Sequence, residues 1–233
     1  MSKVDAICAA AHFIQGGFIA GYLASNETNI SASIKRTSDY GVAQEITYNI
    51  ANLLPVFSFM SSTNHIVRYV SGPTLGNVAQ WLEYGFSASV MLWLIATLSG
   101  IVEISVLVNI VLLNMLLQYI GYRLTQTTDR AQYRRLLTAG FVLHACIWIP
   151  IISTFYAAIE VNNAENIEDG QLEVPKIVYY IIWVMFSLFT VFGIYPIVKD
   201  ISKPSNSSTY SVLSLVTKSL LVWMVFFGII REE

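Results

Sequence analysis

Two charged residues stand inside otherwise apolar stretches of the chain. Lys218 lies in the middle of STYSVLSLVTKSLLVWMVFFGII at residues 208–230, and Glu83 lies in QWLEYGFSASVMLWL at residues 80–94. A charged side chain at the centre of a bilayer costs roughly 2.5 to 3.5 kcal/mol on insertion scales, so intramembrane charges usually mark functional sites. Lys218 and Glu83 are therefore the first candidates for chemistry.

The two charges are predicted to lie at the same depth. Glu83 follows Pro73, a favoured first helical position, by about ten residues, and Lys218 follows Thr209 by about nine, so both lie roughly 15 Å from one membrane face at 1.5 Å per residue. Lysine forms Schiff bases with carbonyl compounds, and a protonated Schiff base still needs a carboxylate partner. A structural ion pair and the Lys–Glu pair of a transporter remain alternatives at this point.

Hydroxyl groups accompany both charges. Ser214 precedes Lys218 by one helical turn and Ser87 follows Glu83 by one turn, so each hydroxyl lies on the face that carries the charge. A hydroxyl can hydrogen-bond to a buried charge without adding a second formal charge. The spacing therefore predicts a polar but singly paired site around Lys218.

Aromatic and histidine residues complete the candidate set. Phe189, Phe192 and Tyr195 recur at steps of three in a pattern more typical of a core, but beside a Schiff-base lysine they would suit a flat polyene. His12 and His65, with Ser61 one turn from His65, could form a polar cluster that holds or accepts a proton. No pair of histidines has metal-ligand spacing, so we expect no metal site.

Composition identifies the class of protein that must position these residues. The 233 residues are 55% hydrophobic and 12% charged, with a mean hydropathy of +0.59, whereas soluble domains carry about 25% charged residues. Stretches of about 20 apolar residues can span a bilayer as helices, and we predict seven in a single all-α membrane domain over residues 1–233: approximately 4–24, 43–66, 74–98, 101–122, 133–158, 175–198 and 209–230. With a net charge of −2 and no basic tract, nucleic acid is excluded as a partner.

The charges between the spans predict the orientation. Short loops rich in Lys and Arg stay in the cytoplasm, and one side holds 8 of the 13 basic residues: Lys3, Arg68, Arg123, Arg130, Arg134, Arg135, Lys199 and Lys203. The other side holds most of the acids, including the run from Glu160 to Glu173. We therefore predict a cytoplasmic N-terminus and an extracellular C-terminus. The long loop at 25–42 then lies outside, where it could form a hairpin.

Four stretches of this sequence resemble the heliorhodopsins, a branch of the microbial rhodopsin superfamily. They are HFIQ at 12–15, Ser61 with His65, WLEYGFSAS at 81–89 and SLVTKSLLVW at 214–223. A cytoplasmic N-terminus is also typical of that family. One departure is Gln80, because related proteins often have arginine at this place.

The resemblance implies a set of roles for the candidate residues. All-trans retinal would be bound to Lys218 as a protonated Schiff base, with Glu83 as its single counterion. Ser214 would stand where pumping rhodopsins usually have a second carboxylate, Ser87 would hydrogen-bond near Glu83, and His12, His65 and Ser61 would form the cytoplasmic proton network. Tyr84, Met91, Phe189, Phe192 and Tyr195 are the further retinal-contacting residues that we expect. The family also implies a homodimer and a small sheet in the first outer loop.

The expected function is that of a light sensor, not an enzyme. The resemblance implies a slow-cycling sensor without net ion transport. A pump would need a second deep carboxylate as proton donor, and the sequence offers none. We therefore predict a photoreceptor in the cell membrane that signals to an unknown partner. A light-gated proton conductor is one alternative, with Glu103 on its exit path. A non-photochemical membrane protein with a structural Lys218–Glu83 pair is the other.

Overall fold

Seven α-helices and one β-hairpin make up the described part of the chain in this computed structural model. The structure describes residues 3–28, 30–38, 41–71, 73–164, 175–198 and 207–231. The helices are α1 (Lys3–Ser25), α2 (Leu53–Val70), α3 (Pro73–Leu98), α4 (Ile104–Gln126), α5 (Arg130–Ala164), α6 (Lys176–Val198) and α7 (Ser207–Val225), with a π-helical turn at Phe226–Ile230. The predicted seven-helix, all-α bundle is confirmed.

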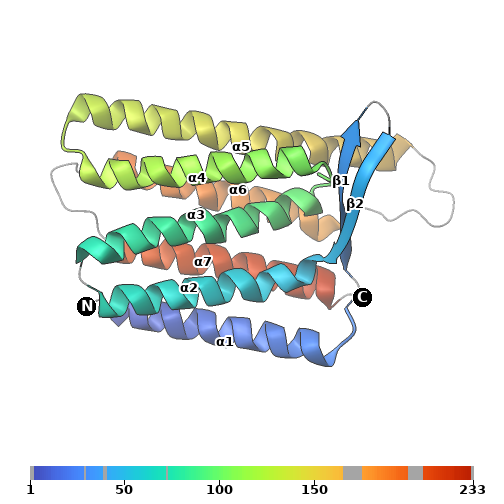
Figure 1. Cartoon of the computed structure of the whole chain (residues 1–233), viewed down its shortest axis with the longest axis horizontal. Helices are drawn as coiled ribbons and strands as arrows, with labels where there is room; N and C mark the ends of the chain where they lie inside the picture. Colours follow the sequence, from blue (N-terminus) through green and yellow to red (C-terminus); the bar gives the residue numbers. More distant parts are fainter. Residues whose placement is uncertain are drawn as a thin grey trace.

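The helices lie side by side with their axes roughly aligned (Figure 1). The start of α1 and the turn between α4 and α5 lie at one end, which we call the N-terminal end, and the hairpin and the C-terminus lie at the other. The cytoplasmic location of the N-terminal end stays a prediction. Residues 165–173, which carry most of the predicted acidic run, and Lys199 and Lys203 lie outside the described residues.

The second predicted span is wrong at its start. Residues 43–49 belong to strand β2 (Gly41–Asn49), which pairs antiparallel with β1 (Ser31–Ser38), and a 3₁₀ turn (Ile50–Asn52) leads into α2 at Leu53. The strand contains β-branched and aromatic residues such as Ile46 and Tyr48, which suit a pleated surface as well as a helix. The expected hairpin in the first loop is therefore present, and it is longer than the sequence suggested.

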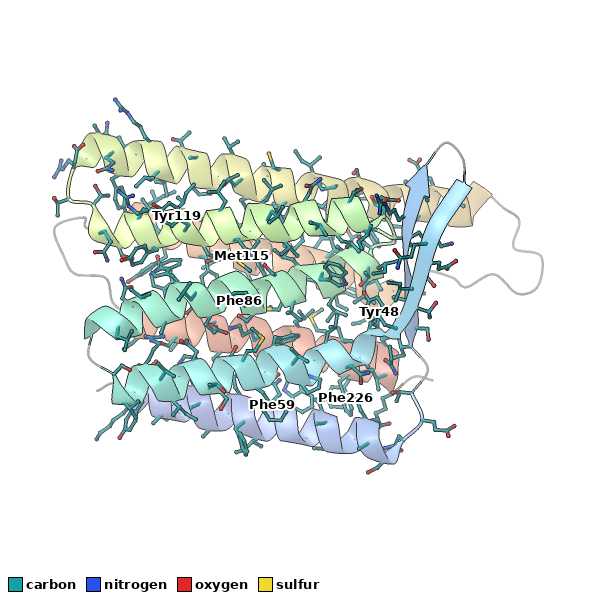
Figure 2. All side chains as sticks on the ribbon, viewed as in Figure 1. Tyr48, Phe59, Phe86, Met115, Tyr119 and Phe226 are labelled. Carbon is teal, nitrogen blue, oxygen red and sulfur yellow. The ribbon has the colours of Figure 1, made fainter. Side chains whose placement is uncertain are left out.

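Hydrogen bonds attach the hairpin to the bundle. The Lys35 amide donates to the Val102 carbonyl at 2.7 Å, next to the start of α4. The Trp93 indole on α3 donates to the Tyr48 hydroxyl at 2.7 Å, and Figure 2 shows Tyr48 at this end of the bundle. These contacts fix the sheet over the ends of α3 and α4.

Helix α2 carries six buried polar residues. Six helices of the described chain are long and apolar enough to cross a membrane by themselves, and α2 is not among them. Its polar residues are buried inside the bundle rather than exposed to lipid: Ser58, Ser61, Ser62, Asn64, His65 and Arg68. Large apolar side chains such as Phe86 on α3, which is 55% exposed, point outward instead. The chain thus hides its polar groups between helices, as a membrane protein must.

Candidate retinal site

Lys218 and Glu83 meet in the interior of the bundle. The Nζ atom of Lys218 on α7 lies 2.5 Å from Oε1 of Glu83 on α3, and both side chains are almost fully buried. The Nζ atom also donates to the Ser61 hydroxyl on α2 at 2.6 Å, and that hydroxyl lies 2.6 Å from the same Glu83 oxygen. Three helices therefore converge on one ion pair, in which the charges are desolvated and held by short hydrogen bonds.

The second oxygen of Glu83 and two nearby hydroxyls have no such partners. Within the described part of the chain, Glu83 Oε2, Ser87 Oγ and Ser214 Oγ are buried and make no hydrogen bond of normal geometry. Buried polar atoms are almost always satisfied by protein, water or a ligand. The surroundings of Lys218 therefore have hydrogen-bonding capacity that protein atoms do not use.

An apolar cavity extends from Lys218 between α3, α4, α5, α6 and α7. Six of the predicted residues line it together with Lys218: Tyr84, Ser87, Met91, Phe189, Phe192 and Ser214. The Lys218 ammonium lies 5.3 Å from the centre of the Tyr84 ring. The cavity is mostly apolar, and Lys218 forms part of its wall.

Tyr195 does not line this cavity. It packs edge-on against Tyr210 with 4.9 Å between ring centroids, and Tyr210 itself forms the wall. A step of three residues turns a helix by about 300°, so Tyr195 is rotated by about 120° from Phe189 on α6. The positions that keep to the face are Gly193 and Pro196.

Several lining residues escaped the sequence reasoning. Helical spacing could have found Tyr210, which lies on the Lys218 face two turns before it, and Trp81, which shares a face with Tyr84 and Met91. The wall formed by α4 and α5 carries no comparable sequence signal: Leu117, Gln118, Gly121, Leu137, Gly140, Phe141 and His144. His144 had no predicted role, and its Nε2 atom lies 3.0 Å from the Thr190 hydroxyl at the cavity wall.

The two predicted histidines are brought together. The rings of His12 on α1 and His65 on α2 stack with centroids 5.8 Å apart, and both residues are fully buried. His65 follows Ser61 by one turn of α2, so the histidine pair lies one turn from the Lys218–Glu83 pair toward the N-terminal end. Both nitrogens of His12 and the Nε2 atom of His65 have no hydrogen-bond partner among the described residues.

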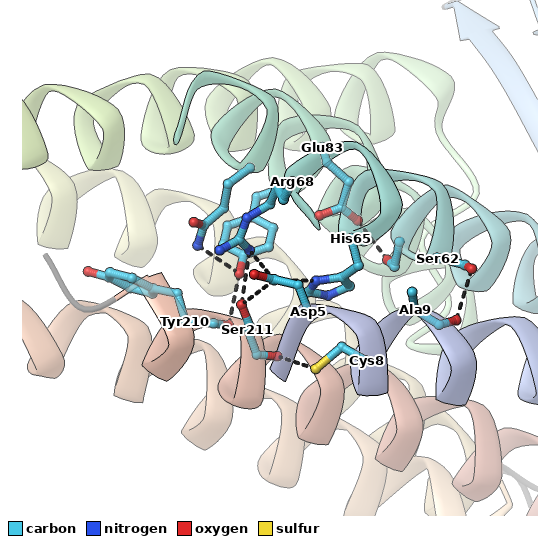
Figure 3. Close-up of polar contacts among 12 residues, drawn as sticks. Asp5, Cys8, Ala9, Ser62, His65, Arg68, Glu83, Tyr210 and Ser211 are labelled. Atoms are coloured by element: carbon cyan, nitrogen blue, oxygen red, sulfur yellow. Dashed lines mark hydrogen bonds and ion pairs between the residues drawn. The ribbon is translucent and has the colours of Figure 1, made fainter. Parts of the chain in front are cut away.

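A second charged cluster beside His65 was not predicted. Asp5 on α1 is buried and contacts His65, Arg68 and Ser211, as Figure 3 shows. The charge pattern predicts Arg68 in a loop, whereas it is 6% exposed and lies in the last turn of α2. A charged residue in the last turn of a helix can extend to water or pair with a buried group. The sequence is the same in both cases, so such a residue is easily mistaken for a loop residue.

Glu103 lies at the far end of the bundle from this cluster. Its Oε2 atom accepts hydrogen bonds from the Thr37 hydroxyl at 2.5 Å and the Thr37 amide at 3.2 Å. These hydrogen bonds hold the pKa of the exposed Glu103 carboxyl below its usual range. Glu103 is therefore an ionised anchor of the β-hairpin.

Comparison with solved structures agrees with the fold. A light-driven proton pump, LR (Mac) from Leptosphaeria maculans, superposes with a TM-score of 0.72 at 8% identity over 97% of this chain and 93% of that chain. A thermophilic rhodopsin from Rubrobacter xylanophilus gives 0.64 at 12% identity over 97% and 94%. At these identities the likeness shows the fold alone. No curated protein matches the sequence.

The family model of the heliorhodopsins matches residues 1–230. This match covers nearly the whole chain, including the Lys218, Glu83 and His65 segments that suggested the resemblance. The chain belongs to the heliorhodopsin family, and it is therefore a retinal-binding photoreceptor of the membrane and not an enzyme.

Proposed function

We propose that this protein is a light sensor in which retinal, in the all-trans form, is linked to Lys218 as a protonated Schiff base with Glu83 as counterion. The observation that carries the proposal is the buried Lys218–Glu83 pair, whose lysine lines the apolar cavity. Tyr84, Met91, Phe189 and Phe192 would contact the polyene, and Tyr210 takes the place that we expected for Tyr195.

The residues around Lys218 fit this group. Buried atoms without a partner, namely Glu83 Oε2, Ser87 Oγ and Ser214 Oγ, offer hydrogen bonds to the linkage or to water beside it. Aromatic walls give the flat apolar surface that a polyene needs. When bound, retinal supplies absorption of visible light and a change of shape on isomerisation.

The role of the protein is to control one proton. Glu83 stabilises the positive charge on the Lys218 nitrogen in the dark, because the two groups are buried in contact. A light-driven change in the direction of that N–H bond weakens its contact with Glu83. Ser61, which bonds to both groups, and His65, one turn away, then provide the polar route toward the N-terminal end.

The residues that could carry a proton along the helices favour a sensor over a proton conductor. In the described chain, Ser214 and not a carboxylate stands one turn from Lys218, and Glu103 is occupied by the hairpin. A slow photocycle, a cytoplasmic N-terminus, a homodimer and an unidentified signalling partner belong to the same proposal. Photocurrents that scale with light intensity in patch-clamped cells would overturn the sensor assignment in favour of the conductor.

The chromophore assignment is tested with two variants. Lys218→Arg keeps a positive charge near Glu83 but cannot form a Schiff base, whereas Ser219→Ala leaves the lysine intact. With added retinal, we expect a visible absorption band in the unmodified protein and in Ser219→Ala, and none in Lys218→Arg. Hydroxylamine under illumination should bleach the band. A band that survives in Lys218→Arg would refute the assignment.

A further inference from the structure

Asp5 is the centre of a buried hydrogen-bonded cluster at the N-terminal end of the bundle. Its Oδ1 atom lies 3.0 Å from His65 Nδ1, 3.0 Å from the Ser211 hydroxyl and 3.4 Å from the Arg68 guanidinium. Arg68 also donates to Ser211 at 3.0 Å. The cluster joins α1, α2 and α7, and none of these four residues is more than 6% exposed.

A purely structural role does not explain why charged residues are buried here. Burying a carboxylate and a guanidinium costs several kcal/mol per ion, and packed apolar residues would hold the helices at least as well. Asp5 lies in the first turn of α1, where the helix dipole stabilises a negative charge. Asp5 is thus placed at the start of the helix with His65 and Arg68 as its partners.

The contact with Asp5 determines which nitrogen of His65 carries a proton. A carboxylate accepts hydrogen bonds, so Nδ1 is the protonated nitrogen in the neutral ring. Nε2 then has a free lone pair, and it has no partner among the described residues. A base oriented by a carboxylate in this way is the arrangement that general acid–base sites use.

His65 is also a neighbour of the residue that contacts the Lys218–Glu83 pair. It is one turn from Ser61, whose hydroxyl contacts both groups. The charged and titratable side chains that surround His65 come from α1, α2, α3 and α7: Asp5, Cys8, His12, Arg68, Glu83 and Lys218. Of these, Asp5 alone combines a negative charge with a direct bond to the ring.

We propose that Asp5 is a positioning residue that holds His65 with Nδ1 protonated and Nε2 free to accept the proton released near Lys218. The proposal rests on the proposed function. One proton leaves the Lys218 nitrogen and binds Nε2, which turns the ring into an imidazolium paired with the Asp5 carboxylate. The same proton returns to the Lys218 nitrogen in the dark, so the cycle neither consumes nor releases a proton overall.

The test has one arm that needs no retinal. The chain has three histidines, so ¹⁵N-histidine labelling of the retinal-free protein gives few signals, and a His65→Asn sample assigns those of His65. We expect the unmodified protein to show protonated Nδ1 and unprotonated Nε2. Asp5→Asn should mix the two tautomers, and Ser211→Ala, which removes a different bond to the same oxygen, should not. His65 with protonated Nε2 in the unmodified protein would overturn the proposal.

The second arm follows the proton in the retinal-loaded protein. After a flash, loss and recovery of the visible band report deprotonation and reprotonation of the Lys218 nitrogen. Because a positioned base contributes about 10²- to 10⁴-fold to proton transfer, Asp5→Asn should slow the loss at least tenfold, with an unchanged dark spectrum. Asp5→Glu should restore part of the rate, and Ser211→Ala should change it less than about threefold.

The two arms separate the proposals. An unmodified protein without a visible band refutes the chromophore assignment, while the ¹⁵N spectrum still decides the tautomer of His65. A normal visible band with an unaltered rate in Asp5→Asn overturns the role of Asp5 alone. If Asp5→Asn does not fold, the spectrum of the unmodified protein and the Asp5→Glu rate decide the question.

Discussion

Replacing the counterion tests the central pair most directly. In Glu83→Gln the side chain keeps its size and a hydrogen-bonding oxygen, but it loses the negative charge that lies 2.5 Å from the Lys218 nitrogen. Removing one partner of a buried ion pair costs about 3 to 5 kcal/mol, because the other charge is left uncompensated. With about 1.36 kcal/mol per pH unit, the protonated linkage should be lost at a pH about 2 to 4 units lower than in the unmodified protein.

The assay is a pH titration of the absorption spectrum in the dark. Glu83→Gln should convert from its visible band to a near-ultraviolet band at the lower pH, and Glu83→Asp should lie between the variant and the unmodified protein. At pH values where the variant stays protonated, its band should move to longer wavelength. The counterion charge otherwise localises the positive charge on the nitrogen in the ground state.

One outcome would refute this reasoning. If Glu83→Gln titrates within about half a pH unit of the unmodified protein and keeps its absorption maximum, another carboxylate must balance Lys218. Ser87→Ala serves as the matched control, because it removes a buried polar group near Glu83 without changing the charge. A shift of equal size in Ser87→Ala would assign the effect to general disturbance of the site.

Two further predictions concern packing and the hairpin. A Cβ atom on Gly121 would lie 2.1 Å from the Trp81 ring in the cavity wall, so Gly121→Ala should destabilise the protein by about 1 to 3 kcal/mol and shift the visible band. Gly17→Ala, whose Cβ meets nothing within 4 Å, should leave both the melting temperature and the band unchanged. Because the pKa of Glu103 is lowered by its bonds to Thr37, these bonds stabilise the hairpin above the ordinary glutamate pKa of about 4.3 and are lost as pH falls through the lowered value. Hydrogen exchange at the Thr37 amide should therefore accelerate in acid relative to its intrinsic rate. It should also accelerate in Glu103→Gln at neutral pH. Equal protection of this amide in Glu103→Gln and in the unmodified protein would contradict the role of Glu103 as an anchor.

The sequence was sufficient for the ion pair because depth and helical phase are both regular. Lys218 and Glu83 lie in long apolar helices, where the rise per residue converts spacing directly into depth. The same regularity placed Ser61 and His65 on one face. It did not place Tyr195, since steps of three drift around the helix, and it gave no information on the α4 and α5 wall, whose contribution depends on how the helices pack.

The regions that sequence reasoning misread are those where polarity has two explanations. Arg68 and Asp5 lie near helix ends, where a charge can face water or a buried partner, and only packing against α7 decides between them. Strand β2 has enough apolar residues to extend a predicted span, and its pairing with β1 shows otherwise. Local composition therefore predicts the membrane helices, while contacts between distant segments determine which polar residues cluster.

Helix α2 carries buried polar groups along one face. Its buried groups Ser61, His65 and Arg68 recur at steps of four and three, so they form one stripe along the helix. The stripe begins at the Lys218–Glu83 pair and ends at Asp5 and Ser211, close to the N-terminal end. A helix that had only to span lipid would gain by losing these groups, since each must be desolvated and paired. Their arrangement as a continuous line from the lysine to one end of the bundle favours proton movement toward that end over a purely structural ion pair.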